Sequence, residues 1–170
     1  MGGLIQLNKE LTEKLNKKYN VFFDWIIEKQ NKTTKPLLFG FSCNDGWYWL
    51  LDNLMNSIYH YQKLNQHLKG NEKFIQITQV KEKFGGLCFY YNGGNEAIRG
   101  MVSLAENLSY KICENCGTTE NVGRTKGWIY VCCEKCYKNN DRARDLDWIP
   151  NENIRLEKLN KIKKLINKDN

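Results

Sequence analysis

The chain has 170 residues, of which 41% are hydrophobic and 12% aromatic, enough for one domain with its own core. No apolar run approaches the ~20 residues of a membrane helix, and no signal peptide is evident, so we expect a cytoplasmic protein without membrane contact. The net charge is +7, and residues 124–170 carry 12 basic and 7 acidic side chains. This asymmetry is typical of a protein with an anionic partner, although a solvated Lys-rich helix also explains it.

The N-terminal part is predicted to be helical. Leucines recur at helical spacing from Leu4 to Leu15, and an apolar run then leads to the polar break at 31–36, which predicts one long helix or two short ones. Asp45 stands at an N-cap position, and the following helix ends near Gly70. The apolar face of that helix is formed by Trp47, Leu50, Leu51, Leu54, Ile58, Tyr61, Leu64 and Leu68.

Residues 74–92 are predicted to form a β-hairpin, because strand-forming residues flank Gly85 and Gly86. A two-residue Gly85-Gly86 turn would place Phe84 opposite Leu87. The remaining pairs would be Lys83 with Cys88, Glu82 with Phe89, Lys81 with Tyr90, and Val80 with Tyr91.

The two faces of this hairpin predict different roles for its charges. Glu82 shares a face with apolar side chains, so it needs either a cation from another element or a ligand. Lys81, Lys83 and Tyr90 share the opposite face with Cys88. Two ammonium groups beside a tyrosine suit a phosphate or a stacked base, although a solvent-exposed sheet face also tolerates them.

A further helix is predicted from Asn95, which is its N-cap. Its apolar face is formed by Ile98, Met101, Val102, Ala105 and Leu108.

Four cysteines have the spacing of metal ligands. Cys113 and Cys116 form one C-x2-C pair, and after sixteen intervening residues Cys133 and Cys136 form another, which indicates a tetrahedral, structural Zn2+ site. Cys132 is a rival to Cys133 as third ligand. A knuckle, a hairpin turning near 126–127 and a helix within 133–144 would form a treble clef.

No catalytic arrangement is evident in the sequence. Treble-clef nucleases use a histidine, but no histidine follows His67, and His60 and His67 lie seven residues apart on the predicted helix, about 10 Å along its axis. A four-thiolate shell leaves no open position for substrate. We therefore expect a protein that is not an enzyme.

The predicted fold is α+β, with helices packed on a small antiparallel β-hairpin sheet, a zinc module and a C-terminal helix. Residues 1–110 would form the core and 111–148 the treble clef packed on it. Pro150 separates this module from a basic helix at 151–170 with a thin apolar stripe.

Several motifs in the chain resemble a known family. Asn44-Asp45-Gly46-Trp47 before a helix, the 80–90 segment VKEKFGGLCFY, the helix from Asn95 to Tyr110, and the four cysteines with Gly127-Trp128 are similar to a widespread family of small proteins of tailed phages and their bacterial hosts. The match spans about 43–137. Members usually have Gly where Ser42-Cys43-Asn44 stands and Arg where Cys88 stands. The resemblance implies a phage setting, hence the host cytoplasm, and a zinc-bearing α+β fold.

Two functions follow as expectations. The first is capture of an anionic, nucleotide-like ligand, as a phage protein sequestering a host defence signal would do. The second is nucleic-acid binding or transcription modulation by the zinc module and the basic C-terminal quarter. A homo-oligomer is compatible with either partner. The candidate ligand-binding residues are Asp45, Trp47, Tyr48, Trp49, Lys81, Glu82, Lys83, Tyr90, Arg124 and Trp128.

Overall fold

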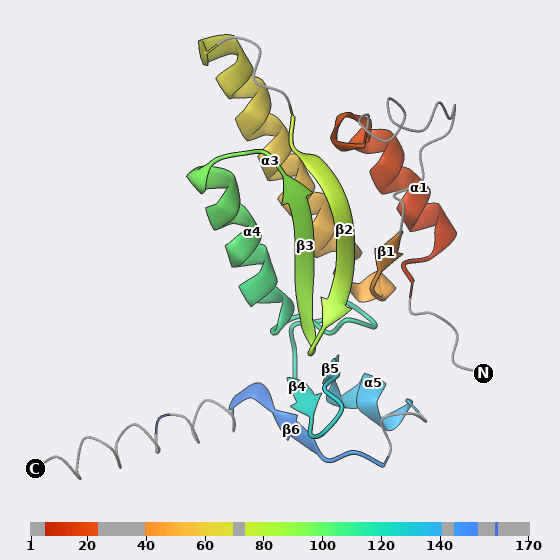
Figure 1. Cartoon of the computed structure of the whole chain (residues 1–170). Coiled ribbons are helices and arrows are strands. Elements are labelled where there is room, and N and C mark those ends of the chain that lie inside the picture. Colours follow the sequence, from red (N-terminus) through yellow and green to blue (C-terminus); the bar gives the residue numbers. More distant parts are fainter. Residues whose placement is uncertain (1–5, 24–39, 70–73, 141–144, 153–158, 160–170) are drawn as a thin grey trace, which may run out of the picture.

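A computed structural model of the chain describes residues 6–23, 40–69, 74–140, 145–152 and 159. It has the predicted α+β architecture, built around two small three-stranded sheets (Figure 1). The helices are α1 (Lys9–Lys18), α3 (Tyr48–Lys69), α4 (Glu96–Ser109) and α5 (Glu134–Lys138), and short 3-10 helices cover Asn20–Phe22 and Asp45–Trp47. The strands are β1 (Phe41–Ser42), β2 (Gln76–Lys83), β3 (Gly86–Asn92), β4 (Val122–Thr125), β5 (Val131–Cys133) and β6 (Trp148–Pro150).

The first sheet has the order β1-β2-β3, and its core lies between one face of the sheet and the helices. β2 and β3 are antiparallel, whereas β1 runs parallel to β2, a pairing that the sequence did not predict. Figure 1 shows α3 behind the hairpin and α4 beside β3. Buried side chains from α3, such as Leu51 and Ile58, join Ile77, Val80 and Phe89 of the hairpin in one apolar cluster.

The predicted hairpin register is wrong by two residues. Lys83 pairs with Gly86, and Val80 pairs with Phe89. The turn therefore consists of Phe84 and Gly85, whose φ angles are +53° and +78°, as a type I′ turn requires. A two-residue shift keeps each side chain on its predicted face. Only Phe84 leaves the apolar face, and its ring is 72% exposed.

Side chains of α4 form hydrogen bonds with backbone N–H groups at the free edge of β3. The Ser109 hydroxyl accepts a hydrogen bond from the Leu87 N–H at 2.9 Å, and the Glu106 carboxylate accepts one from the Phe89 N–H at 3.0 Å. An unpaired strand edge is a template for aggregation, so these bonds both fix the hairpin and close its edge.

Of the predicted helices, α3 and α4 are confirmed, with two corrections in α3 and one in α4, where Leu108 is exposed. The predicted N-terminal helical run corresponds to α1 and the following 3-10 turn, and its part after residue 23 lies outside the described residues. Asn95 caps α4 as expected, because its side chain accepts hydrogen bonds from two backbone N–H groups. Asp45 is not an N-cap: it lies in a 3-10 turn before α3, and its carboxylate accepts two hydrogen bonds from Asn8 at 2.8 Å. Leu64 is exposed rather than buried. None of the helices in the described ranges is long and apolar enough to cross a bilayer.

The second sheet belongs to residues 111–150, which we call the four-cysteine module. Its knuckle, β4-β5 hairpin and α5 follow one another as predicted, but the helix ends at Lys138. β6 adds a third strand, because Arg124 of β4 pairs with Ile149, where the sequence predicted only a break at Pro150. The predicted basic helix at 151–170 lies mostly outside the described residues.

The module is fastened to the core through the segment before α3. The Gly46 N–H donates to the Glu114 carbonyl at 2.8 Å, and the Trp47 indole N–H donates to the Ile112 carbonyl at 3.1 Å. The Asn44 N–H donates to the Glu114 carboxyl at 3.0 Å. The Asn-Asp-Gly-Trp motif thus serves as the docking point for the cysteine knuckle.

Candidate metal centre and binding surfaces

Four cysteine sulfurs lie together at one end of the molecule. The Sγ atoms of Cys113, Cys116, Cys133 and Cys136 all lie within 4.8 Å of one another, and those of Cys116 and Cys133 are 3.8 Å apart. Four thiolates about 2.3 Å from a tetrahedral zinc ion would be separated by roughly 3.8 Å. These residues could therefore hold a metal ion, and their arrangement is compatible with a zinc module.

Local backbone turns position both cysteine pairs. In the first, the Gly117 N–H donates to the Cys113 carbonyl at 2.8 Å, and the φ of Gly117 is +79°, a conformation that favours glycine. In the second, Cys133 caps α5, and its Sγ accepts a hydrogen bond from the Cys136 N–H at 3.4 Å. Each C-x2-C pair is thus folded so that both thiols face the same point.

Cys132 does not belong to the cluster. It is buried among the apolar side chains of the module, and its sulfur is not among the four that lie within 4.8 Å of one another. This geometry favours Cys133 as the third ligand.

The open face of the hairpin brings lysines and aromatic rings together. The Lys81 Nζ lies 5.2 Å from the centroid of the Tyr90 ring, and the Lys83 Nζ lies 5.3 Å from that of Phe84. Lys81 and Tyr90 are not directly opposite one another, as the predicted register had them, because Lys81 pairs with Cys88. They lie on a diagonal of the same face, which long side chains can span.

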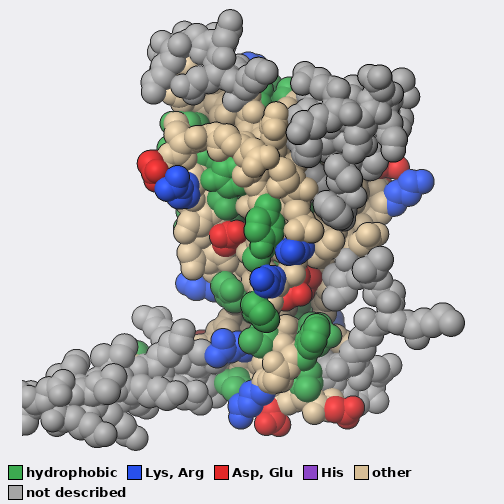
Figure 2. Space-filling view, viewed as in Figure 1, with side chains coloured by type: hydrophobic (Ala, Val, Ile, Leu, Met, Phe, Trp, Pro, Cys, Tyr) green, Lys and Arg blue, Asp and Glu red, His purple; other side chains and the backbone are tan. Residues whose placement is uncertain are grey.

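The module adjoins this face at the hairpin turn. A methyl group at Gly85 would lie 2.6 Å from Cγ2 of Ile129, so the turn contacts the loop between β4 and β5. Trp128, which precedes Ile129 in the chain, is 70% exposed. Figure 2 shows hydrophobic and basic side chains along the middle of this side of the molecule, with a few acidic ones among them. We call Lys81, Lys83, Phe84 and Tyr90, together with the exposed Trp128 of the adjoining loop, the aromatic-basic face.

The other predicted ligand-binding residues lie elsewhere. Trp47 is buried, and Tyr48 packs against the core. Trp49 is exposed on α3. Asp45 is engaged by Asn8. Half-buried Arg124 lies in the central strand of the second sheet.

The cation expected beside Glu82 is not found within the described part of the chain. Instead, its half-buried carboxylate accepts a hydrogen bond from the Gly85 N–H at 2.6 Å. This bond ties the side chain to the hairpin turn.

His60 is exposed and contacts the ring of Tyr59. The side chain of His67 lies outside the described structure. The sequence prediction of two histidines on one helix is confirmed for the backbone, since both lie within α3.

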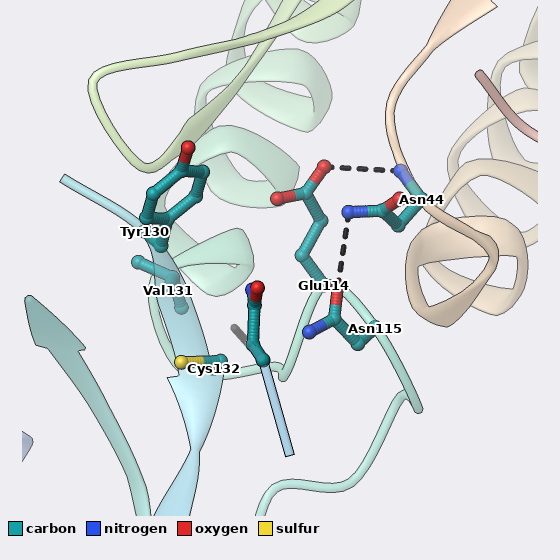
Figure 3. A pocket seen from close by; sticks show the side chains of 7 residues that line it. Asn44, Glu114, Asn115, Tyr130, Val131 and Cys132 are labelled. Atoms are coloured by element: carbon teal, nitrogen blue, oxygen red, sulfur yellow. Dashed lines mark hydrogen bonds between the residues drawn. The ribbon is translucent and has the colours of Figure 1, made fainter. Parts of the chain in front are cut away.

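Sequence reasoning missed Glu114, which lies between the first two cysteines. Its side chain is buried and borders a cavity between the core and the module (Figure 3). Burial, reinforced by the charge of Glu82, raises the pKa of the Glu114 carboxyl to about 7. No sequence signal marks this residue, because a glutamate inside a C-x2-C knuckle is ordinarily exposed.

No protein-family model, curated protein or solved structure matches this chain. The resemblance to a phage family therefore stays a prediction.

Proposed function

We propose that this protein binds single-stranded nucleic acid without catalysing a reaction, and that Zn2+ bound by Cys113, Cys116, Cys133 and Cys136 has a structural role. The observation that carries the proposal is the aromatic-basic face. It combines exposed rings, on which bases stack, with ammonium groups, which contact phosphates.

The shape of this face favours a strand over a free nucleotide. Its aromatic rings are exposed, and none of its residues lines the cavity that is found in the described part of the chain. The cavity beside Glu114 has no lysine or arginine among its lining residues, so it does not suit a phosphate. Capture of a nucleotide-like defence signal, the other expected function, therefore has less support.

Zinc suits the cysteine cluster because soft thiolates select zinc over hard cations such as Mg2+ or Ca2+. A four-thiolate shell leaves no site for a catalytic water. The metal would instead hold together the knuckle that docks on Gly46 and the loop that carries Trp128.

The test is fluorescence anisotropy with a labelled oligothymidylate of about 12 nucleotides, measured over a range of salt concentrations. The wild type should bind, and log K should fall linearly with log[salt]. Lys83→Ala should reduce that slope by about 0.7. Tyr90→Ala should weaken binding by about 1–3 kcal/mol through lost stacking.

The matched control is Lys14→Ala, which removes a lysine from α1 that pairs with Glu10 on the protein surface. It should leave binding unchanged. No binding by the wild type at low salt would overturn the proposal. If a nucleoside monophosphate bound as tightly as the oligonucleotide in calorimetry, nucleotide capture would replace it.

A further inference from the structure

A cavity of about 210 Å³ lies at the boundary between the core and the four-cysteine module. It is partly open to solvent and separate from the residues of the aromatic-basic face. Its lining residues are Asn44, Glu114, Asn115, Tyr130, Val131, Cys132 and Asn140.

The chemical centre of this cavity is the Glu114 carboxyl group. The residue is only 3% exposed, and one of its oxygens, Oε1, accepts the hydrogen bond from the Asn44 N–H. Its second oxygen points away from Asn44, toward the side of the cavity where Tyr130 lies (Figure 3). The Asn44 side chain is itself fixed by a 3.0 Å hydrogen bond to the Asn115 side chain. The carboxyl group is therefore held in one orientation.

The only carboxyl group among the described lining residues of the cavity is that of Glu114, and its burial leaves it little contact with solvent. None of the described lining residues is a lysine or arginine. A buried carboxylate without a cation is costly, so a positively charged guest would be stabilised here and a phosphate repelled.

We propose that this cavity binds a small organic cation of the guanidinium or ammonium type. The N–H groups of the cation would donate to the Glu114 oxygen that does not accept from the Asn44 N–H, and the side-chain oxygens of Asn44 and Asn115 in the same lining offer further acceptors. The volume equals roughly seven water molecules at about 30 Å³ each, enough for such a head group. A Ca2+ ion is less suitable, because it needs about six to eight oxygen ligands and the lining supplies one carboxylate.

The ligand pair methylguanidinium and methylurea tests this inference, because the two have nearly the same shape and only the first is charged. Each is titrated at about pH 8 into the 15N-labelled, metal-loaded protein and followed by NMR. The Asn44 N–H, which donates to Glu114, should shift with methylguanidinium and stay unmoved with methylurea. A titration with Nα-acetylarginine amide then distinguishes the two sources of such a cation. Binding of this compound would indicate an arginine of a protein partner, and its exclusion would indicate a free small cation.

The variant Glu114→Gln keeps an oxygen for the Asn44 N–H and removes the charge, so it should bind methylguanidinium about tenfold more weakly. Glu120→Gln changes an exposed carboxylate of the same module and should bind like the wild type. Equal binding of the charged and neutral ligands, or no binding of either, would overturn the inference and leave a water-filled cavity. If Glu114→Gln does not fold, the ligand pair on the wild type still decides.

Discussion

Gly46 shows how a single side-chain position controls the junction between the core and the module. A methyl group there would come within 2.3 Å of the Cys113 carbonyl oxygen and within 2.5 Å of backbone atoms of Glu114 and Gly117. Backbone atoms cannot rotate away as a flexible side chain can. The glycine is required by close approach, not by its backbone conformation.

We therefore expect Gly46→Ala to lower the free energy of unfolding by about 3 kcal/mol, near the upper end for an overpacked site. Gly100→Ala is the matched control. Gly100 lies on α4 with nothing within 4 Å of a new methyl group, so this change should stabilise the helix by about 0.5–1 kcal/mol. Urea denaturation measures both values. Equal effects of the two substitutions would show that the knuckle does not dock at Gly46.

Among the elements, the hairpin shows both what the sequence predicts and where its rules fail. The alternation of side chains correctly predicts Lys81 and Tyr90 on one face and Val80 and Phe89 on the other. Side chains alternate with a period of two, so an error of two residues in the strand register leaves each of them on its face. The turn was misplaced because two adjacent glycines suit positive φ better than a phenylalanine does. The structure uses Phe84 and Gly85 instead, and the contact of Gly85 with Ile129 depends on tertiary packing.

Other features could not be predicted from local patterns. The pairing of β1 with β2, and of β6 with β4, joins segments far apart in the chain. The cysteine spacing, in contrast, predicted the cluster, since two C-x2-C pairs specify their own geometry. Glu114 was missed because its burial depends on the docking of the knuckle against Asn44.

The turn supports a prediction that separates folding from binding. Phe84→Asn should relieve a positive φ that costs an ordinary residue about 1–2 kcal/mol, while losing the Lys83 contact, worth about 0.5 kcal/mol. The variant should be more stable by about 0.5–1 kcal/mol in thermal unfolding, yet bind oligothymidylate more weakly. Unchanged binding would remove Phe84 from the aromatic-basic face, and a loss of stability would contradict the type I′ turn.

At the scale of the whole molecule, the metal should decide whether the module folds. Native mass spectrometry of the purified protein should show one Zn2+ per chain, and acid should release it as the thiolates are protonated. Cys116→Ser should abolish this mass, whereas Cys132→Ser should retain it, because Cys132 lies outside the cluster. Zinc retained by Cys133→Ser and lost by Cys132→Ser would instead make Cys132 the third ligand.

The contacts between the module and the core make a further consequence of metal loss testable. The knuckle accepts hydrogen bonds from Gly46, Trp47 and Asn44, and the hairpin turn packs on Ile129. Contacts between the core and the module therefore stabilise both sheets. Chelation of the metal should therefore lower the protection of amides in β2, β3 and the start of α3, not only those of the module. Hydrogen exchange with and without a chelator measures this coupling, and Cys132→Ser with its metal bound serves as the control. Unchanged protection of the hairpin amides after chelation would mean that the core folds independently of the module. A shared loss of protection would explain how metal binding holds Trp128 and the hairpin in one binding face.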